Sequence, residues 1–364
     1  MKKRVLAIVI CIATLCICLT SCVNEEIKFI PQRDMSFNYN NVSAGGVDYW
    51  LDNNGFYYCN GVTLRAVGVD GMDHLIGDIF NSVGFVDAIQ RHGDKLYYIS
   101  SRPVDVSETR VLWYEHIVEY DMTLRKETLV IPLESEDRFL AEYKFYIVDG
   151  YCWYLSEGDD ISRVELKEGA RFEVVEKNIF ALGAYGESIR YIARNEFTYT
   201  IYEIDGETNT LGSFELVTYP GEVIYDCVNF TENKVILTYS GEEYAFVVYD
   251  LEDETLTMIA SNEGCEGIAF EEYMFIFEST ETYDEENYCY EYHIDIYRYH
   301  LESGENALIY SADENAGRFF VTSDTEVYLV IDGDRNNIRC VSADGKAESI
   351  VEKSGFYNVL DNFF

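Results

Sequence analysis

The chain has 364 residues, of which 66 are acidic and 27 basic, and its formal net charge is −39 at pH 7. We expect no nucleic-acid partner, because the chain offers no basic surface that could displace counterions from phosphates. With 15% aromatic residues and 31 tyrosines, the chain can bury a large core. A cationic ligand, a metal ion or a basic partner remains open, although a solubilising acidic surface is the simpler interpretation of the charge.

The N-terminal segment has the order of a secretory signal peptide. Lys2, Lys3 and Arg4 form a short basic region, and an almost unbroken apolar run from Val5 to Leu19 follows it. This run is shorter than the roughly 20 residues that a membrane-spanning helix needs. The pattern therefore predicts export of the chain.

The sequence Leu19-Thr20-Ser21-Cys22 closes the apolar run and resembles the lipobox of bacterial lipoproteins. Thr20 departs from the Ala or Ser that is usual at its position. The resemblance implies cleavage between Ser21 and Cys22, acylation of Cys22, and a mature chain held in the lipid bilayer through this residue. Two or more acyl chains anchor a protein stably. The alternatives are an uncleaved membrane anchor and an ordinary signal in which Cys22 is incidental.

Six cysteines remain after the N-terminal segment: Cys59, Cys152, Cys227, Cys265, Cys289 and Cys340. They occur singly, with no CxxC pair and no histidine at zinc spacing. Export permits disulfides, but spacing alone cannot pair these residues. We interpret them mainly as small buried residues and leave one or two disulfides open.

Short β-branched and aromatic runs recur along the rest of the chain, separated by turns rich in Gly, Asp, Asn and Glu. Each unit begins with an aromatic strand, predicted at 55–61, 94–102, 150–158, 187–195, 233–243, 272–280 and 325–334. A second strand and a charged hairpin follow at 63–71, 117–129, 161–169, 201–211, 246–256, 296–308 and 338–350. A third apolar strand, such as "LVIPL" or "FEVVE", usually ends the unit, and an apolar stretch such as "GFVDAIQ", "YDCVNF" or "EGIAF" precedes the next.

Four strands per unit at a spacing of roughly 40–55 residues are typical of β-propeller blades. A blade that is apolar on both faces is not stable alone, but radial stacking buries each face against a neighbour. The sequence therefore predicts an all-β chain with a signal peptide over 1–21, a tether and possible first strand over 22–44, and a β-propeller of four-stranded antiparallel blades over 45–364. Seven blades are expected, with six or eight as alternatives.

The stretch "FYYCNGVTLRAVGVDGMDHLI" resembles a degenerate repeat of the YWTD-type propellers, in which an aromatic strand and a small-residue turn precede Ile-x-Arg-x-x-x-Asp-Gly. "CWYLSEGDDISRVELKEG" and "NNIRCVSADGKAESI" are similar to it, whereas the middle units lose the Arg and the Asp-Gly. The chain is also similar to the DUF5050-type propellers of bacterial exported proteins. "YWLD" at 49–52 nearly spells the motif but precedes the first aromatic strand, so we give it no weight.

The acidic segment "TETYDEENY" at 280–288 is the longest insertion between the aligned strands. A solvated tip is the favoured interpretation, and a site for a cation or a basic partner is the alternative. From Tyr288, an alternating stripe runs through Tyr290, Tyr292 and Ile294 to Ile296. We predict that this stripe is core that fills the wedge between blades, with a sugar-stacking platform as the alternative.

Asp332, Asp334 and Asn336 alternate as the first ligands of a calcium loop do. However, Asn337 stands where the loop needs Gly, and Ala343 stands where it needs Glu. A hairpin turn is therefore the favoured interpretation. We expect no cofactor, with a structural calcium ion at these three side chains as the alternative.

The case for an enzyme is thin, because the chain contains no GxSxG nucleophile elbow, no HExxH and no glycine-rich phosphate loop. "SADG" at 342–345 matches only part of a sialidase Asp box. Among 66 acids, sequence cannot select a carboxylate pair for glycoside cleavage. The five histidines show no repeat-matched placement: His74, His92, His116, His293 and His300. Convergence at a central channel is less expected than scattered positions.

The resulting hypothesis is a lipid-anchored β-propeller that presents one face, or the mouth of its channel, to a protein or glycan ligand. The alternatives are a surface glycan-active hydrolase with carboxylates in the central channel, and an assembly scaffold for envelope proteins. We expect the protein on the extracytoplasmic face of the cell membrane. Val23 follows the anchor instead of an inner-membrane retention Asp. A Gram-positive cell surface is favoured, and a periplasmic or outer-membrane lipoprotein is the alternative.

Overall fold

The computed structural model describes residues 49–52, 55–59, 63–67, 73–78, 86–107, 110–124, 126–133, 145–155, 159–216, 223–240, 244–261, 265–284, 289–314, 316–331 and 338–349. This part of the chain forms 28 β-strands in seven four-stranded sheets. The expected signal peptide and tether, with Ser21 and Cys22, lie outside the described residues, and so do Asp332, Asp334 and Asn336. Within the described ranges no helix is long and apolar enough to cross a membrane.

The first three sheets each contain four consecutive strands that pair antiparallel in chain order. The first consists of β1 (Tyr49–Asp52), β2 (Gly55–Cys59), β3 (Thr63–Val67) and β4 (Asp73–Asp78). The second consists of β5 (Val86–His92), β6 (Lys95–Ser107), β7 (Arg110–Asp121) and β8 (Lys126–Pro132). The third consists of β9 (Phe145–Val148), β10 (Tyr151–Leu155), β11 (Ile161–Glu165) and β12 (Phe172–Glu176).

The remaining four sheets repeat this order. They consist of β13 (Ile179–Tyr185), β14 (Ser188–Asn195), β15 (Thr198–Asp205) and β16 (Glu207–Glu215); and of β17 (Val223–Phe230), β18 (Lys234–Ser240), β19 (Tyr244–Asp250) and β20 (Thr255–Ser261). The last two consist of β21 (Glu266–Phe270), β22 (Tyr273–Asp284), β23 (Cys289–His300) and β24 (Asn306–Ala312); and of β25 (Ala316–Ser323), β26 (Glu326–Ile331), β27 (Ile338–Ser342) and β28 (Ala347–Ser349).

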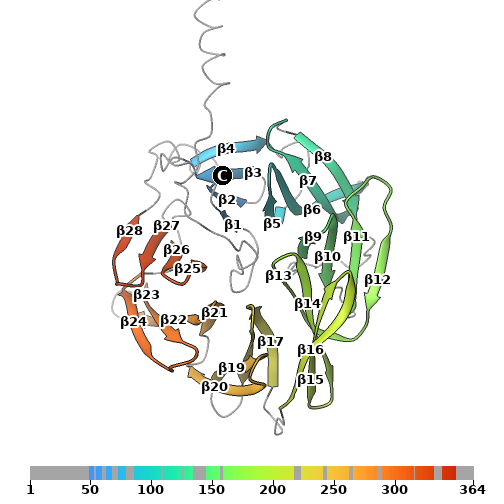
Figure 1. Cartoon of the computed structure of the whole chain (residues 1–364). Helices are drawn as coiled ribbons and strands as arrows, with labels where there is room; N and C mark the ends of the chain where they lie inside the picture. Colours follow the sequence, from blue (N-terminus) through green and yellow to red (C-terminus); the bar gives the residue numbers. More distant parts are fainter. Residues whose placement is uncertain are drawn as a thin grey trace, which may run out of the picture.

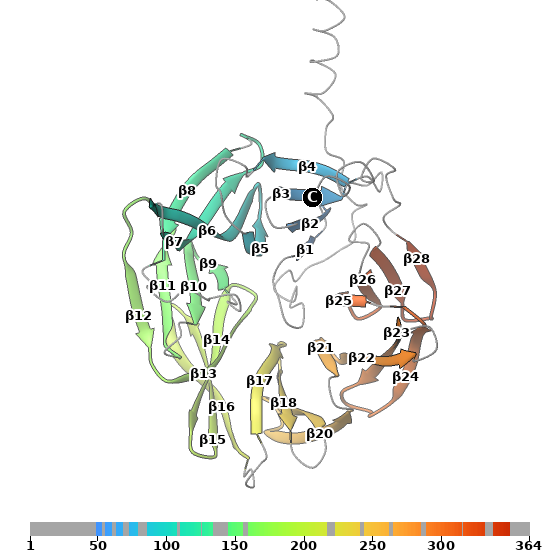
Figure 2. The same cartoon turned by 180° about the vertical axis from the view of Figure 1, so that it is seen from behind.

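The sheets follow one another around a ring, with first strands such as β5, β17 and β21 near the centre and fourth strands such as β8, β20 and β24 outside (Figure 1). The view from behind shows the same radial arrangement (Figure 2). The first strands of successive sheets lie close together. Strand β13 contacts β17, and β17 contacts β21. This is a β-propeller of four-stranded antiparallel blades, as the repeat predicts. "YWLD", to which the motif comparison gives no weight, forms β1.

Clusters of buried apolar side chains lie between neighbouring sheets. Among the described residues they fill five successive junctions, from the sheet β5–β8 to the sheet β25–β28. Strand β22 shows how one strand contributes to two junctions. Its residues Met274 and Ile276 pack towards the sheet β17–β20, and Phe275 and Phe277 pack towards the sheet β25–β28. The Phe277 ring stacks on Phe319 with centroids 5.1 Å apart. Side chains that alternate across a strand therefore serve two cores.

The cysteines with described side chains agree in part with their expected burial. Cys152 is fully buried on β10, and burial raises the pKa of its thiol. Cys340 is also buried, whereas Cys265 is half-buried before β21. All three occur as thiols, and Cys152 and Cys340 lie on different sheets. The side chains of Cys59, Cys227 and Cys289 lie outside the described set.

Candidate functional site

Two hairpins are longer than the others and mark one side of the ring. Strands β6 and β7 have 13 and 12 residues, and β22 and β23 have 12 each. The second and third strands of the other sheets have five to eight residues. Because each long hairpin joins the second and third strands of its blade, and all blades share one strand order, both extend from the same side of the ring. The candidate site is the outer part of the β22–β23 hairpin, where the structure describes side chains on both strands.

One face of the β22–β23 hairpin passes from the core to the surface. Ile294 and Ile296 on β23 are fully buried against the sheet β25–β28. Beyond them on the same face, Tyr292 is half-buried and Tyr290 is 55% exposed. Tyr283, directly across from Tyr290 on β22, is 47% exposed. The prediction that this stripe is core is therefore right for the isoleucines and wrong for Tyr290.

The exposed tyrosines form a continuous aromatic surface. The rings of Tyr283 and Tyr290 have centroids 5.0 Å apart, and those of Tyr290 and Tyr292 are 6.5 Å apart. Pairs of this kind on a sheet stabilise the ribbon by a few tenths to about 1 kcal/mol. We call Tyr283, Tyr290 and Tyr292 the tyrosine face. Of these three residues, Tyr283 and Tyr290 are exposed to solvent.

The opposite face of the hairpin is polar and carries Thr280, Thr282, Glu291 and His293. His293 Nδ1 lies 2.7 Å from Asp313 Oδ1. Its Nε2 lies 3.3 Å from an oxygen of Asp295. The hydrogen bond with Asp313 raises the pKa of His293 above its ordinary value, and the charge of Asp295 adds to the shift.

A groove of about 440 Å³ connects these groups. It is lined by Thr280 and Thr282 on β22, by residues 290–293 on β23, and by Asp313 and Glu314 after β24. Glu314 contacts Arg339 at 2.6 Å, and its second oxygen accepts a hydrogen bond from Tyr310. The groove thus combines aromatic rings, hydroxyls and carboxylates, the groups with which proteins bind polar ligands.

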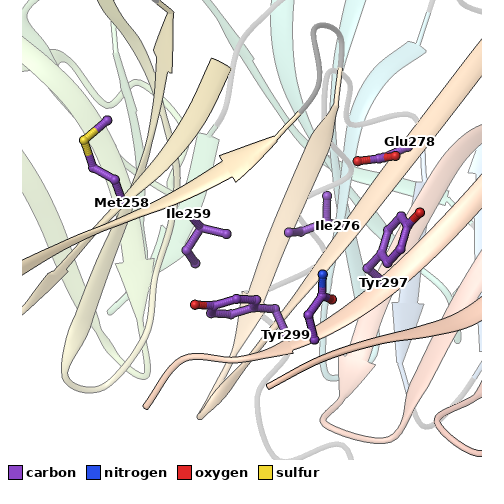
Figure 3. Close-up of a pocket in the computed structure, with 7 residues that line it drawn as sticks. Met258, Ile259, Ile276, Glu278, Tyr297 and Tyr299 are labelled. Carbon is purple, nitrogen blue, oxygen red and sulfur yellow. The ribbon is translucent and has the colours of Figure 1, made fainter. Parts of the chain in front are cut away.

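A smaller pocket of about 190 Å³ lies between β20 and the strands β22–β24 (Figure 3). Ile259, Ile276 and Tyr299 approach one another there, and Glu278 lies beside Tyr297. Ile259 and Ile276 belong to the buried core between the two sheets. We interpret this pocket as a crevice in the packing of two blades.

The five histidines lie on four different strands. His74 lies on β4, His92 ends β5, His116 lies on β7, and His300 ends β23. The Nδ1 atom of His300 accepts hydrogen bonds from the backbone of the turn that follows it. Among the described residues no group of three His, Cys, Asp or Glu side chains could hold a metal ion. His293 is the residue of this set that lines the groove.

Sequence reasoning placed the acidic insertion at the right hairpin but did not find the cluster of His293 with Asp295 and Asp313. The two carboxylates come from β23 and from the residue after β24. Their approach depends on the β23–β24 register, in which Asp295 pairs with Ser311 and a bulge follows Ile296. Asp295 and Asp313 are 18 residues apart in a bulged hairpin, and this spacing does not reveal in the sequence that the two meet at His293.

Comparisons with known proteins support the fold alone. No family model and no curated protein matches the chain. A puromycin hydrolase S511A mutant complexed with PGG is similar over 91% of this chain and 56% of that chain, with 12% identity and a TM-score of 0.52. Hsv2p of Kluyveromyces lactis covers 81% of this chain and 92% of its own, with 10% identity and a TM-score of 0.50. The β-propeller domain of the Trilobed protease from Pyrococcus furiosus is similar over 74% of this chain and 84% of that chain, with 13% identity and a TM-score of 0.47.

Proposed function

We propose that the protein is a lipid-anchored, extracytoplasmic β-propeller that acts as a binding module. The ligand would be held on the side of the ring from which the two long hairpins extend. The observation that carries this proposal is the β22–β23 hairpin, where Tyr283 and Tyr290 are exposed beside a groove of about 440 Å³. Exposed aromatic side chains that are grouped on one surface are a feature of sites that bind ligands or proteins.

We also propose that the seven sheets close into seven blades of the YWTD type. Support comes from the four-strand order, which repeats from β1 to β28. In the first sheet Tyr58 on β2 pairs with Arg65 on β3, the aromatic and basic positions of the motif. Closure would remove the exposed sides of the first and last sheets.

A binding assay with the full chain in detergent tests the proposed module. The chain would be applied to arrays of cell-surface glycans and of peptides, together with a Tyr283→Ala/Tyr290→Ala variant. We expect the variant to bind about tenfold more weakly or worse, because two stacking surfaces are lost. Phe197→Ala is the control, since Phe197 is 45% exposed in a hairpin of another sheet. Equal binding by the double variant, or conversion of a ligand into products, would contradict the proposal.

Lipid attachment is tested in cells grown with a radioactive fatty acid. The wild-type chain should carry the label and sediment with membranes, and Cys22→Ala should lose both properties. Cys265→Ala serves as the control, because Cys265 lies within the propeller before β21. Label that survives in Cys22→Ala, or a wild-type chain without label, would refute lipid attachment at this residue.

A further inference from the structure

The crevice of about 190 Å³ between β20 and the strands β22–β24 lies on the face of its sheet opposite the tyrosine face. Ile276 and Glu278 alternate onto this face from β22. Their cross-strand partners Tyr297 and Asp295 do so from β23. The crevice is therefore a separate feature of the same blade, and an inference about it does not depend on the proposed binding function.

The crevice has an apolar wall and an acidic end (Figure 3). Ile259 and Ile276 are buried and approach the half-buried ring of Tyr299. The carboxylate of Glu278 lies beside the ring of Tyr297, and both residues are half-buried. The volume is close to the liquid volume of about six water molecules, so the crevice has room for a small ligand only.

The polar groups at the acidic end have no partner within the fold. Among the described residues, neither the Glu278 carboxylate nor the Tyr297 hydroxyl takes part in a hydrogen bond or an ion pair. Burial, and then the negative charges of Glu278 and Asp295, raise the pKa of Tyr297 above its ordinary value. The Tyr297 hydroxyl thus stays protonated and uncharged beside two carboxylates.

Negative charge is concentrated at this end of the crevice. Glu278 on β22 lies directly across from Asp295 on β23. Like charges in this position destabilise a sheet. Asp295 lies 3.3 Å from Nε2 of His293, which is further out on the hairpin. None of the described residues that line the crevice is a Lys or an Arg. A bound cation would supply the missing positive charge.

We propose that this crevice binds an aliphatic primary amine in its cationic form. The ammonium group would donate hydrogen bonds to the carboxylate of Glu278 and to the hydroxyl oxygen of Tyr297. The alkyl chain would lie against Ile259, Ile276 and the ring of Tyr299, where it leaves water.

The same groups disfavour other small ligands. An anion would meet two carboxylates, Glu278 and Asp295, without a basic side chain in the lining. A neutral alcohol of the same length would contact the apolar wall equally well. It would leave the charge of Glu278 without a counter-ion, and hydrogen bonds in which both partners are charged are the stronger ones. Charge therefore decides which ligand binds.

Ligand-observed nuclear magnetic resonance with the full chain in detergent tests this proposal, with empty micelles as the blank. The probes are n-butylammonium, 1-butanol and butyrate at pH 7. We expect n-butylammonium to bind at least about tenfold more tightly than 1-butanol, and butyrate not to bind. Absence of n-butylammonium binding would overturn the proposal. Equal binding of 1-butanol would also overturn it, because the crevice would then act as an apolar gap only.

Glu278→Gln should weaken n-butylammonium binding about tenfold or more, because the charged hydrogen-bond acceptor is lost. The variant should unfold at the same temperature as the wild type or a higher one, since it removes the repulsion between Glu278 and Asp295. Thermal unfolding therefore separates loss of binding from loss of the fold.

Glu281→Gln is the matched control. Glu281 is exposed on the same strand, but it pairs with Tyr292 and so lies on the other face. Equal losses in the two variants would show general charge attraction and would overturn the proposal, as would unchanged binding by Glu278→Gln. Binding of array ligands that depends on Tyr283 and Tyr290 is a separate result, so either proposal can fail while the other stands.

Discussion

The side-chain amide of Asn229 binds both polar groups of the Ala269 backbone. Its Nδ2 donates to the Ala269 carbonyl oxygen at 2.7 Å, and its Oδ1 accepts from the Ala269 N–H at 3.1 Å. Asn229 lies on β17 and Ala269 on β21, the innermost strands of successive sheets. Gln90 on β5 similarly donates to the carbonyl of Phe145 on β9. Buried amides thus join the inner edges of neighbouring blades, where no strand ladder exists.

Asn229→Ala should lower the free energy of unfolding by about 2–4 kcal/mol, because it leaves two buried backbone groups without partners. Urea denaturation followed by circular dichroism measures this loss. Asn209→Ala is the control, since Asn209 is exposed and its amide contacts only a backbone oxygen two residues away at 3.5 Å. Similar destabilisation by the two variants would contradict a special role for the Asn229 amide.

The contact between Asn229 and Ala269 shows where prediction from sequence ends. The apolar stretches "YDCVNF" and "EGIAF" predict two strands, and these form most of β17 and all of β21. The pattern does not show that Asn229 points to a backbone 40 residues away, because only the closure of adjacent blades brings the two together. Local alternation specifies which residues form a strand, and stacking in the ring decides what they meet.

Gly183→Ala should also destabilise the propeller, by about 1–3 kcal/mol, because the new methyl group overfills a packed junction. A Cβ at Gly183 on β13 would lie 2.4 Å from a ring carbon of Phe230 on β17. At Gly212 on β16 the nearest atom, in Tyr249, would be 3.2 Å away, so Gly212→Ala should cost less. Thermal unfolding of both variants checks the order. A larger loss for Gly212→Ala would mean that Phe230 moves aside easily.

We expect the carboxylate of Glu119 to cause part of the pH dependence of the protein's stability. Its side chain is 8% exposed on β7. Burial alone would raise the pKa of Glu119, but hydrogen bonds from Lys95, Thr128 and Tyr97 outweigh it and hold the pKa below the ordinary value of 4.5. A carboxyl with a lowered folded pKa stabilises the fold above its unfolded pKa. This contribution is lost as the pH falls through the folded value.

Glu119→Gln should therefore destabilise the protein at pH 7 and differ less from the wild type at pH 3. Urea denaturation at pH 7, 5 and 3 gives the two curves. Glu302→Gln, in an exposed turn after β23, should change the free energy of unfolding by less than about 0.5 kcal/mol. A gap between wild type and Glu119→Gln that stays constant with pH would show that Glu119 acts through shape and not through its charge.

The tyrosine stripe shows a second limit of sequence analysis. Tyr290, Tyr292, Ile294 and Ile296 share one face of β23, so alternation assigns all four to the same environment. The isoleucines are buried against the sheet β25–β28, whereas Tyr290 on the same face is 55% exposed. Burial on this face is decided by the neighbouring sheet and not by the strand itself. A periodic pattern on one strand does not contain this information.

His293 should titrate above its ordinary pKa of 6.5, because the hydrogen bond with Asp313 and the charge of Asp295 favour the protonated ring. Protonation lets Nδ1 donate to Asp313 while Nε2 donates towards Asp295 or Ser311. Nuclear magnetic resonance of the histidine rings gives the midpoint, assigned through His293→Gln.

Asp313→Asn should lower that midpoint, because the amide cannot supply the negative charge that stabilises the imidazolium. Asp253→Asn, an exposed acid in the turn between β19 and β20, should leave it unchanged. A midpoint that does not move in Asp313→Asn would mean that Asp295 controls the protonation of His293. In that case the residue after β24 would contribute its charge to the groove without holding the histidine in place.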